Sequence, residues 1–255
     1  EYAKAVKAYE DALRHLPGDA DLTRNYIDAL VGAARDAARH DRNRESAEMY
    51  SSAIETAPER RAELLREYAD QLTYSGRAAV AVDLYREIIA GQFGSEINDL
   101  RLHSALGLAL LWSDQPAAAR MVFERLLEIA PQDIEVRERL AESLVSLARR
   151  EASIDRNAEA AALFERALTL APGKRAEWLK EFADQLTYAQ RAPEAIERYS
   201  EMLHDFPLSS EARTDVRLSL ALAQSWSGAL HEALTEYEAL IADDPSTFAA
   251  AMVQL

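Results

Sequence analysis

The chain repeats itself after 114 residues, and this repeat constrains the fold more strongly than any other feature of its 255 residues. Pro58–Tyr74 aligns without a gap on Pro172–Tyr188, with 12 of 17 positions identical. The same offset carries Trp112 onto Trp226. Self-similarity at a fixed period is typical of repeat architectures, in which each unit buries its apolar face against the next one.

Three shorter repeats make up each 114-residue unit. Each contains one aromatic residue at a regular position, usually with alanine four and sixteen positions before it. One face of the helices therefore carries small side chains. Eight positions after the aromatic stands a proline or, once, Phe93, and proline ends a helix. Helix hairpins are therefore predicted to end near residues 17, 58, 93, 131, 172, 207 and 245. The aromatics are Tyr9, Tyr50, Tyr85, Phe123, Phe164, Tyr199 and Tyr237.

These spacings resemble the tetratricopeptide repeat, whose pattern is Trp-x2-Leu-Gly-x2-Tyr, then Ala-x3-Phe, then Pro, in about 34 residues. Leu65, Ala69, Ala81 and Tyr85 fall on this pattern, and the resemblance extends over the whole chain. It implies an all-α, right-handed superhelical solenoid of helix hairpins spanning residues 1–255. The 114-residue units would cover 3–116 and 117–230, with a partial unit at 231–255.

Two repeats, those ending at Pro58 and Pro172, are seven residues longer than the family pattern, which is about two helical turns. We expect this insertion to extend both helices of these hairpins around Arg39–Glu45 and Arg150–Glu159, so that their tips protrude. The chain begins inside a second helix, Tyr2–Leu16, and stops within a first helix, Thr247–Leu255. We therefore expect further repeats on both sides in the parent protein.

Composition and motifs argue against several function classes. The formal net charge of −15 disfavours nucleic-acid binding, because a phosphate backbone would be repelled. The sequence has no uninterrupted apolar run of about 18 residues, so it predicts no membrane span. Cysteine is absent. The five histidines are scattered without metal-ligand spacing, and no phosphate-binding loop or nucleophile elbow occurs. We therefore expect a non-catalytic protein without a metal or cofactor.

The family resemblance also indicates where a partner would bind. In tetratricopeptide repeats the concave groove is lined by first helices, at positions fixed relative to the small residue. Asp70 and Asp184 stand where the carboxylate-binding members of the family carry a cation or an amide, so a receptor for chaperone tails is disfavoured. The matching groove positions are Arg66, Asp70, Thr73, Tyr74, Trp112, Lys180, Asp184, Thr187, Tyr188 and Trp226.

The four groove aromatics have two interpretations. In the first, Tyr74, Trp112, Tyr188 and Trp226 close each hairpin tip by packing over the tight turn, since aromatics at helical spacing usually pack. In the second they form a ladder of partly exposed rings beside Asp and Thr side chains, suited to stacking on sugars or anchoring a peptide. The sequence leaves both interpretations open.

A second resemblance concerns the hairpin tips. The segments Asp-Gln-Leu-Thr-Tyr-Ser-Gly and Ser-Trp-Ser-Gly are similar to those of the periplasmic solenoids of bacterial exopolysaccharide export proteins for cellulose, poly-N-acetylglucosamine or Pel. The resemblance implies a periplasmic scaffold that recruits polysaccharide-modifying enzymes and guides polymer to an outer-membrane pore. The alternative is a cytoplasmic adaptor that binds a peptide or helix in the same groove. Partners would be proteins and, in the first case, also a polysaccharide.

Overall fold

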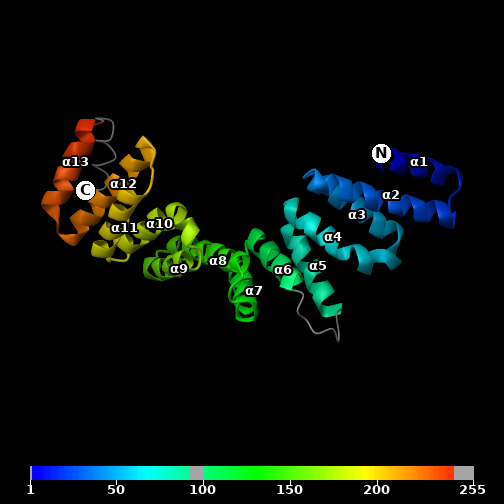
Figure 1. Cartoon of the computed structure of the whole chain (residues 1–255), viewed down its shortest axis with the longest axis horizontal. Coiled ribbons are helices and arrows are strands. Elements are labelled where there is room, and N and C mark those ends of the chain that lie inside the picture. The colour runs from blue at the N-terminus through cyan, green and yellow to red at the C-terminus, as the bar shows by residue number, and fades with distance from the viewer. Residues whose placement is uncertain (1, 92–99, 244–255) are drawn as a thin grey trace. The chain divides into compact units, whose positions relative to one another are not determined.

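The computed structural model describes residues 2–91 and 100–243, and within these ranges it contains helices and turns but no strand (Figure 1). Short 3-10 turns, η1 (Pro58–Arg60) and η2 (Pro172–Lys174), precede two of the helices. The α-helices are α1 (Tyr2–His15), α2 (Ala20–Arg39), α3 (Asn43–Thr56), α4 (Arg61–Tyr74), α5 (Ala78–Gly91), α6 (Leu100–Trp112), α7 (Pro116–Ile129), α8 (Ile134–Ala152), α9 (Asn157–Leu170), α10 (Arg175–Tyr188), α11 (Ala192–Asp205), α12 (Ser210–Ser227) and α13 (Leu230–Asp243).

The helices pack in consecutive pairs within two compact units. The first unit, Glu1–Pro131, holds α1 and the hairpins α2–α3, α4–α5 and α6–α7. The second, Gln132–Leu255, holds the hairpins α8–α9, α10–α11 and α12–α13. The expected all-α fold of stacked helix hairpins is confirmed. The division at residues 116 and 230 stays a prediction, and the hairpin ends expected at 93 and 245 and the helix expected at Thr247–Leu255 lie outside the described residues.

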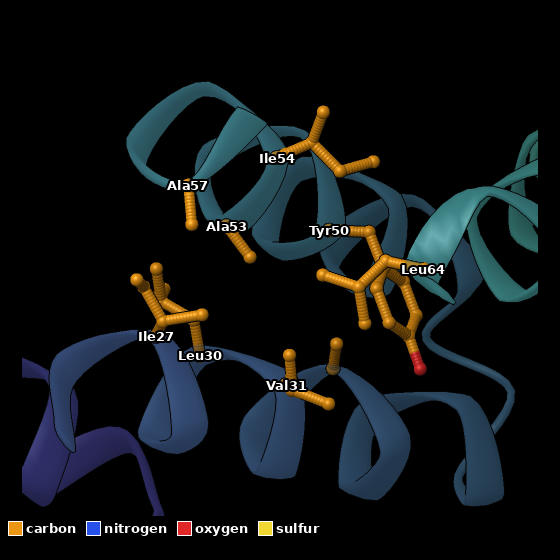
Figure 2. Packing of buried hydrophobic residues seen from close by; sticks show 9 residues of the cluster. Ile27, Leu30, Val31, Tyr50, Ala53, Ile54, Ala57 and Leu64 are labelled. Atoms are coloured by element: carbon orange, nitrogen blue, oxygen red, sulfur yellow. The ribbon is translucent and has the colours of Figure 1, made fainter. Parts of the chain in front are cut away.

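The core forms where one hairpin meets the next. Figure 2 shows Ile27, Leu30 and Val31 of α2 facing Tyr50 and Ala53 of α3, and Ile54 belongs to the same cluster. Leu64 from α4 belongs to the same cluster, and Val6 of α1 packs against it. Because no single hairpin supplies all of these side chains, each one depends on its neighbours to bury its apolar face.

From α3 onwards, each second helix carries a buried aromatic that packs towards small residues. The six described aromatics from Tyr50 to Tyr237 that follow the repeat are at most 3% exposed. They lie sixteen residues after Ala34, Ala69, Gly107, Ala148, Ala183 and Ala221, which are all buried. The fit is closest at Gly107, where an added Cβ would lie 2.6 Å from Cζ of Phe123. The small positions therefore leave room for the ring and let the two helices approach.

Every described hairpin tip is closed by the same backbone motif. A left-handed residue stands nine positions before the aromatic, at Asp41, Gly76, Asp114, Asp155, Gln190 and Gly228. At the α4 tip the Arg77 N–H donates to the Leu72 carbonyl at 2.8 Å and the Gly76 N–H donates to the Thr73 carbonyl at 3.3 Å. This pair of bonds is the Schellman motif, which satisfies carbonyls at the helix end.

The expected placement of the seven-residue insertion is wrong. The left-handed residues Asp41 and Asp155 stand nine positions before the aromatic, as in the other hairpins, and α3 and α9 are each 14 residues long, like α5. The insertion instead lengthens α2 and α8 to 20 and 19 residues, compared with 14 in α4 and α10. In these repeats the small residue, the aromatic and the proline keep their spacings of 16 and 8 residues, so the added residues lie at the start of the first helix.

Ion pairs repeated at the 114-residue period link neighbouring hairpins. Arg35 of α2 donates two hydrogen bonds to Glu67 of α4, at 2.8 and 2.6 Å. Arg149 of α8 forms the equivalent pair with Glu181 of α10, at 2.8 and 2.7 Å. Two parallel bonds between a guanidinium and a carboxylate fix orientation as well as distance. These pairs therefore help to set the register between consecutive first helices.

The tip motif predicts that Gln190→Gly stabilises the protein. Gln190 has a φ of 61°, which costs a side-chain-bearing residue roughly 1–2 kcal/mol, while glycine adopts it freely. Part of this gain is lost to the greater flexibility of glycine in the unfolded chain, so we expect about 0.5–1 kcal/mol in the free energy of unfolding from denaturant titration. The control Ala189→Gly, at a φ of −78°, should lower stability instead.

The packing at Gly107 predicts that Gly107→Ala is destabilising although alanine is the better helix former. Overpacking against the Phe123 ring costs about 1–3 kcal/mol, which exceeds the roughly 1 kcal/mol gained in helix propensity. Thermal denaturation should show a lower Tm. Phe123→Leu should cost less in the Gly107→Ala background than in the wild type, and independent effects of the two substitutions would contradict this account.

Candidate binding surface on the first helices

The four aromatics expected in the groove all lie at the C-terminal ends of first helices. Tyr74 and Trp112 are the last residues of α4 and α6, Tyr188 is the last residue of α10, and Trp226 is the penultimate residue of α12. The left-handed residue of each tip stands two positions after the ring. The tip geometry thus places each ring at the same point of its hairpin.

The rings form two edge-to-face pairs, one in each unit. The centroids of Tyr74 and Trp112 are 5.5 Å apart with the ring planes at 77°, and those of Tyr188 and Trp226 are 5.9 Å apart at 65°. Such arrangements are favourable because the positive edge of one ring meets the negative face of the other. Adjacent hairpins are therefore joined by ring contacts at this end of their first helices.

All four rings nevertheless remain about half exposed, between 50% and 53%. Ring packing thus covers only part of each aromatic, in contrast to the buried aromatics of the second helices. The third tryptophan, Trp178 of α10, is 3% exposed. Binding to the exposed halves of the rings stays a prediction, but the contact surface it requires is present in both units.

The charged residues expected in the groove lie on the same helix face as the tyrosines. Arg66, Asp70 and Tyr74 succeed each other at four-residue spacing along α4, as do Lys180, Asp184 and Tyr188 along α10. Such residues stand above one another on a helix. The Lys180 Nζ lies 3.1 Å from the Asp184 Oδ2. The two units therefore present a cation, an acid and a ring in the same order.

Thr73 and Thr187 do not lie on the surface, contrary to the expectation for groove hydrogen-bonding groups. They are 2% and 1% exposed, and each hydroxyl donates at 3.0 Å to the carbonyl four residues earlier, of Ala69 and Ala183. Each threonine stands four residues after the buried small residue, and thus on the face that packs inward. The threonines belong to the hairpin core rather than to a binding surface.

Buried tyrosine hydroxyls hold the two aspartates in place. The Tyr85 hydroxyl donates to the Asp70 Oδ1 at 2.5 Å, and the Tyr199 hydroxyl donates to the Asp184 Oδ1 at 2.6 Å. Desolvation raises the pKa of both carboxyl groups above the usual aspartate value, although the hydrogen bonds oppose this shift. Desolvation likewise raises the pKa of both tyrosines, and the nearby aspartates add to this effect.

One polar residue of this surface was missed from the sequence. Asp215 of α12 lies with its Oδ2 3.1 Å from the Lys180 Nζ. It stands eleven residues before Trp226, which is close to three helical turns, so the two side chains share a face. That spacing could have identified Asp215, but its partner on α10 becomes apparent only from the packing.

The described ranges contain no group of three or more acidic or histidine side chains that could hold a metal ion. Among the same residues, no helix combines the length and the apolar character that crossing a bilayer would need.

Comparisons with known proteins agree with the hairpin geometry. Residues 100–143 match the family described as tetratricopeptide repeat. A MamA structure from AMB-1 aligns with a TM-score of 0.51 at 19% identity, covering 76% of this chain and 97% of its own. Another MamA structure aligns with a TM-score of 0.50 at 15% identity, covering 74% and 94%. A tetratricopeptide repeat protein from Parabacteroides merdae covers 94% and 86%, at 13% identity and a TM-score of 0.45. No curated protein matches the chain.

These findings define the fold. The chain has the fold of the tetratricopeptide-type solenoids and carries a sequence match to that repeat over α6, α7 and the start of α8. Proteins of this architecture generally act as non-enzymatic scaffolds that bind other proteins on the surface their stacked hairpins create.

The part-buried Tyr85–Asp70 pair predicts a pH-dependent effect of Asp70→Asn. Asparagine keeps the acceptor oxygen for the hydroxyl but removes the charge that burial disfavours. The raised pKa means that folding favours the protonated carboxyl, so stability is gained as the pH falls through the folded pKa and lost as it rises.

We therefore expect Asp70→Asn to raise the free energy of unfolding at neutral pH, with the difference vanishing once the pH falls below the ordinary aspartate range. Urea titrations of both proteins over this pH range measure it. A variant that is less stable at neutral pH would show that the carboxylate is net favourable. Asp184→Asn should raise the free energy of unfolding by less, because it also removes an ion-pair partner of Lys180.

Proposed function

We propose that this protein is a non-catalytic scaffold that binds protein partners along its first helices. The observation that carries the proposal is the half-exposed Tyr–Trp pair, which occurs once in each unit, Tyr74 with Trp112 and Tyr188 with Trp226. Tyrosine and tryptophan are enriched among residues that dominate binding energy at interfaces, because they bury a large area at low entropic cost. The flanking charges of the same helices would contribute specificity rather than most of the affinity.

We further propose that the scaffold works in the periplasmic part of an exopolysaccharide secretion system. There it would recruit enzymes that modify the polymer and guide the polymer towards an outer-membrane pore. The support is the motif resemblance at the hairpin tips, Asp70–Gly76 and Ser225–Gly228, which include the two ring positions Tyr74 and Trp226. A cytoplasmic adaptor that holds a peptide or helix would use the same surface.

Tryptophan fluorescence tests both levels of the proposal. The protein is titrated separately with acidic oligosaccharides, with amine-bearing oligosaccharides and with purified polysaccharide-modifying enzymes, as wild type, Trp112→Ala and Trp226→Ala. A saturable response to an enzyme that both substitutions weaken supports the scaffold, and a saturable glycan response adds the role in guiding polymer. The expected loss is roughly 1–2 kcal/mol per ring, or about tenfold in Kd.

A matched control separates surface binding from unfolding. Trp178→Phe removes the buried tryptophan and should leave the affinity unchanged. Partner binding that survives loss of both Trp112 and Trp226 would overturn the scaffold surface proposed here. Binding to a peptide-bearing protein with no response to any glycan would instead favour the adaptor.

A further inference from the structure

The two copies of the aromatic surface differ in charge at one position. At the 114-residue offset, Asp215 of α12 corresponds to Arg101 of α6, while Lys180 and Asp184 correspond to Arg66 and Asp70. The second unit thus carries one cation and two acids where the first unit carries two cations and one acid. Duplicated surfaces with opposite charge balance are suited to different ligands.

In the second unit the charges form a connected cluster. The Lys180 Nζ lies 3.1 Å from the Asp184 Oδ2 and 3.1 Å from the Asp215 Oδ2, so the ammonium is shared by two carboxylates. Asp184 is also held by the Tyr199 hydroxyl. The lysine is therefore already neutralised within the cluster, and one negative charge is left over.

Asp215 is the accessible member of this cluster. Its side chain is 61% exposed, compared with 27% for Lys180 and 25% for Asp184. Along α12 it shares a face with Trp226, roughly 16 Å away at 1.5 Å per residue, and that face reaches the Tyr188 ring across the helix pair. An exposed carboxylate and an exposed ring pair thus mark the two ends of one stripe.

We propose that this stripe, composed of Lys180, Asp184, Tyr188, Asp215 and Trp226, docks a basic linear segment of a protein partner. An Arg or Lys side chain of the segment pairs with Asp215, and an apolar side chain of the segment packs against the exposed rings. The proposal rests on the scaffold function and adds the chemistry of the partner to it. The net charge of −15 favours the encounter with such a segment.

The geometry favours a peptide over a sugar or a carboxylate. A sugar ring stacks on an open flat face, whereas Tyr188 and Trp226 meet at 65° and form a corner that suits a compact side chain. A carboxylate would need a cation with unused capacity, and the ammonium of Lys180 already serves Asp184 and Asp215. The structure therefore assigns the binding charge to Asp215.

Fluorescence anisotropy with three labelled peptides tests the assignment. The peptides share one sequence with a central leucine and differ only in two flanking positions, which are Arg, Gln or Glu. The whole 255-residue chain is used as wild type, Asp215→Arg, Asp215→Asn and Trp226→Ala. We expect the Arg peptide to bind the wild type most tightly and to lose affinity as salt is raised.

Asp215→Arg should lower the affinity for the Arg peptide about tenfold, and Asp215→Asn should lower it about threefold. The affinity for the Gln peptide should change little. Glu238→Arg makes the same change in net charge on the exposed surface of α13. It should change the affinity for the Arg peptide only by the small effect of net charge. Arg101→Asp, the reciprocal change in the first unit, should increase binding of the Arg peptide. Unchanged thermal denaturation of Asp215→Asn excludes a folding defect.

Three results would overturn the inference. They are equal binding of the three peptides, equal losses for Asp215→Arg and Glu238→Arg, and tight binding of amine-bearing oligosaccharide with no binding of the Arg peptide. Peptide binding that depends on Trp226 but not on Asp215 would leave the scaffold function standing while rejecting the basic partner. Loss of enzyme binding on substitution of the tryptophans tests the scaffold itself and is independent of peptide charge.

Discussion

The packing of a large ring against a small residue sixteen positions earlier is the constraint on which the rest of the structure depends. It brings the two helices of each hairpin together, and the left-handed residue of the tip stands nine positions before the ring in every described hairpin. Phe123 lies directly against Gly107, and Tyr50 lies in one core cluster with Ala34. Since the spacing from tip to ring does not vary, length variation is confined to the other end of the first helix, as α2 and α8 demonstrate. The fixed tip also places Tyr74 and Trp226 at the same point of their hairpins.

Much of this could be predicted from the sequence because it follows from local rules. Prolines mark helix ends, alanines mark close approaches, and a 114-residue period reveals stacking. The position of the insertion was not predictable from the repeat length alone, since length does not say which end of a helix grows. The burial of Thr73 departs from the family's groove positions because Thr73 stands four residues after Ala69, on the inward face of α4. The Lys180–Asp215 contact joins two helices, and spacing within one helix cannot reveal it.

Duplication explains why the two surfaces can be alike in shape and different in charge. Some features recur in both units because changing them would disturb packing. They are the buried rings, the tips and the ion pairs Arg35–Glu67 and Arg149–Glu181. Arg101 in the first unit and Asp215 in the second are both exposed, so the charge at this position can differ with little cost to folding. Stability and recognition are thus carried by different residues of the same helices, which allows one scaffold to present two binding surfaces.

The claim that the half-exposed rings are the contact surface is tested most directly by fluorine NMR of the chain labelled with fluorotryptophan. Its three tryptophans provide their own control, because Trp112 and Trp226 are exposed and Trp178 is buried. On addition of a binding enzyme or peptide, the account predicts that the resonances of Trp112 or Trp226 shift and lose solvent accessibility while that of Trp178 stays unchanged. Saturable binding that leaves both exposed tryptophans unperturbed would contradict it.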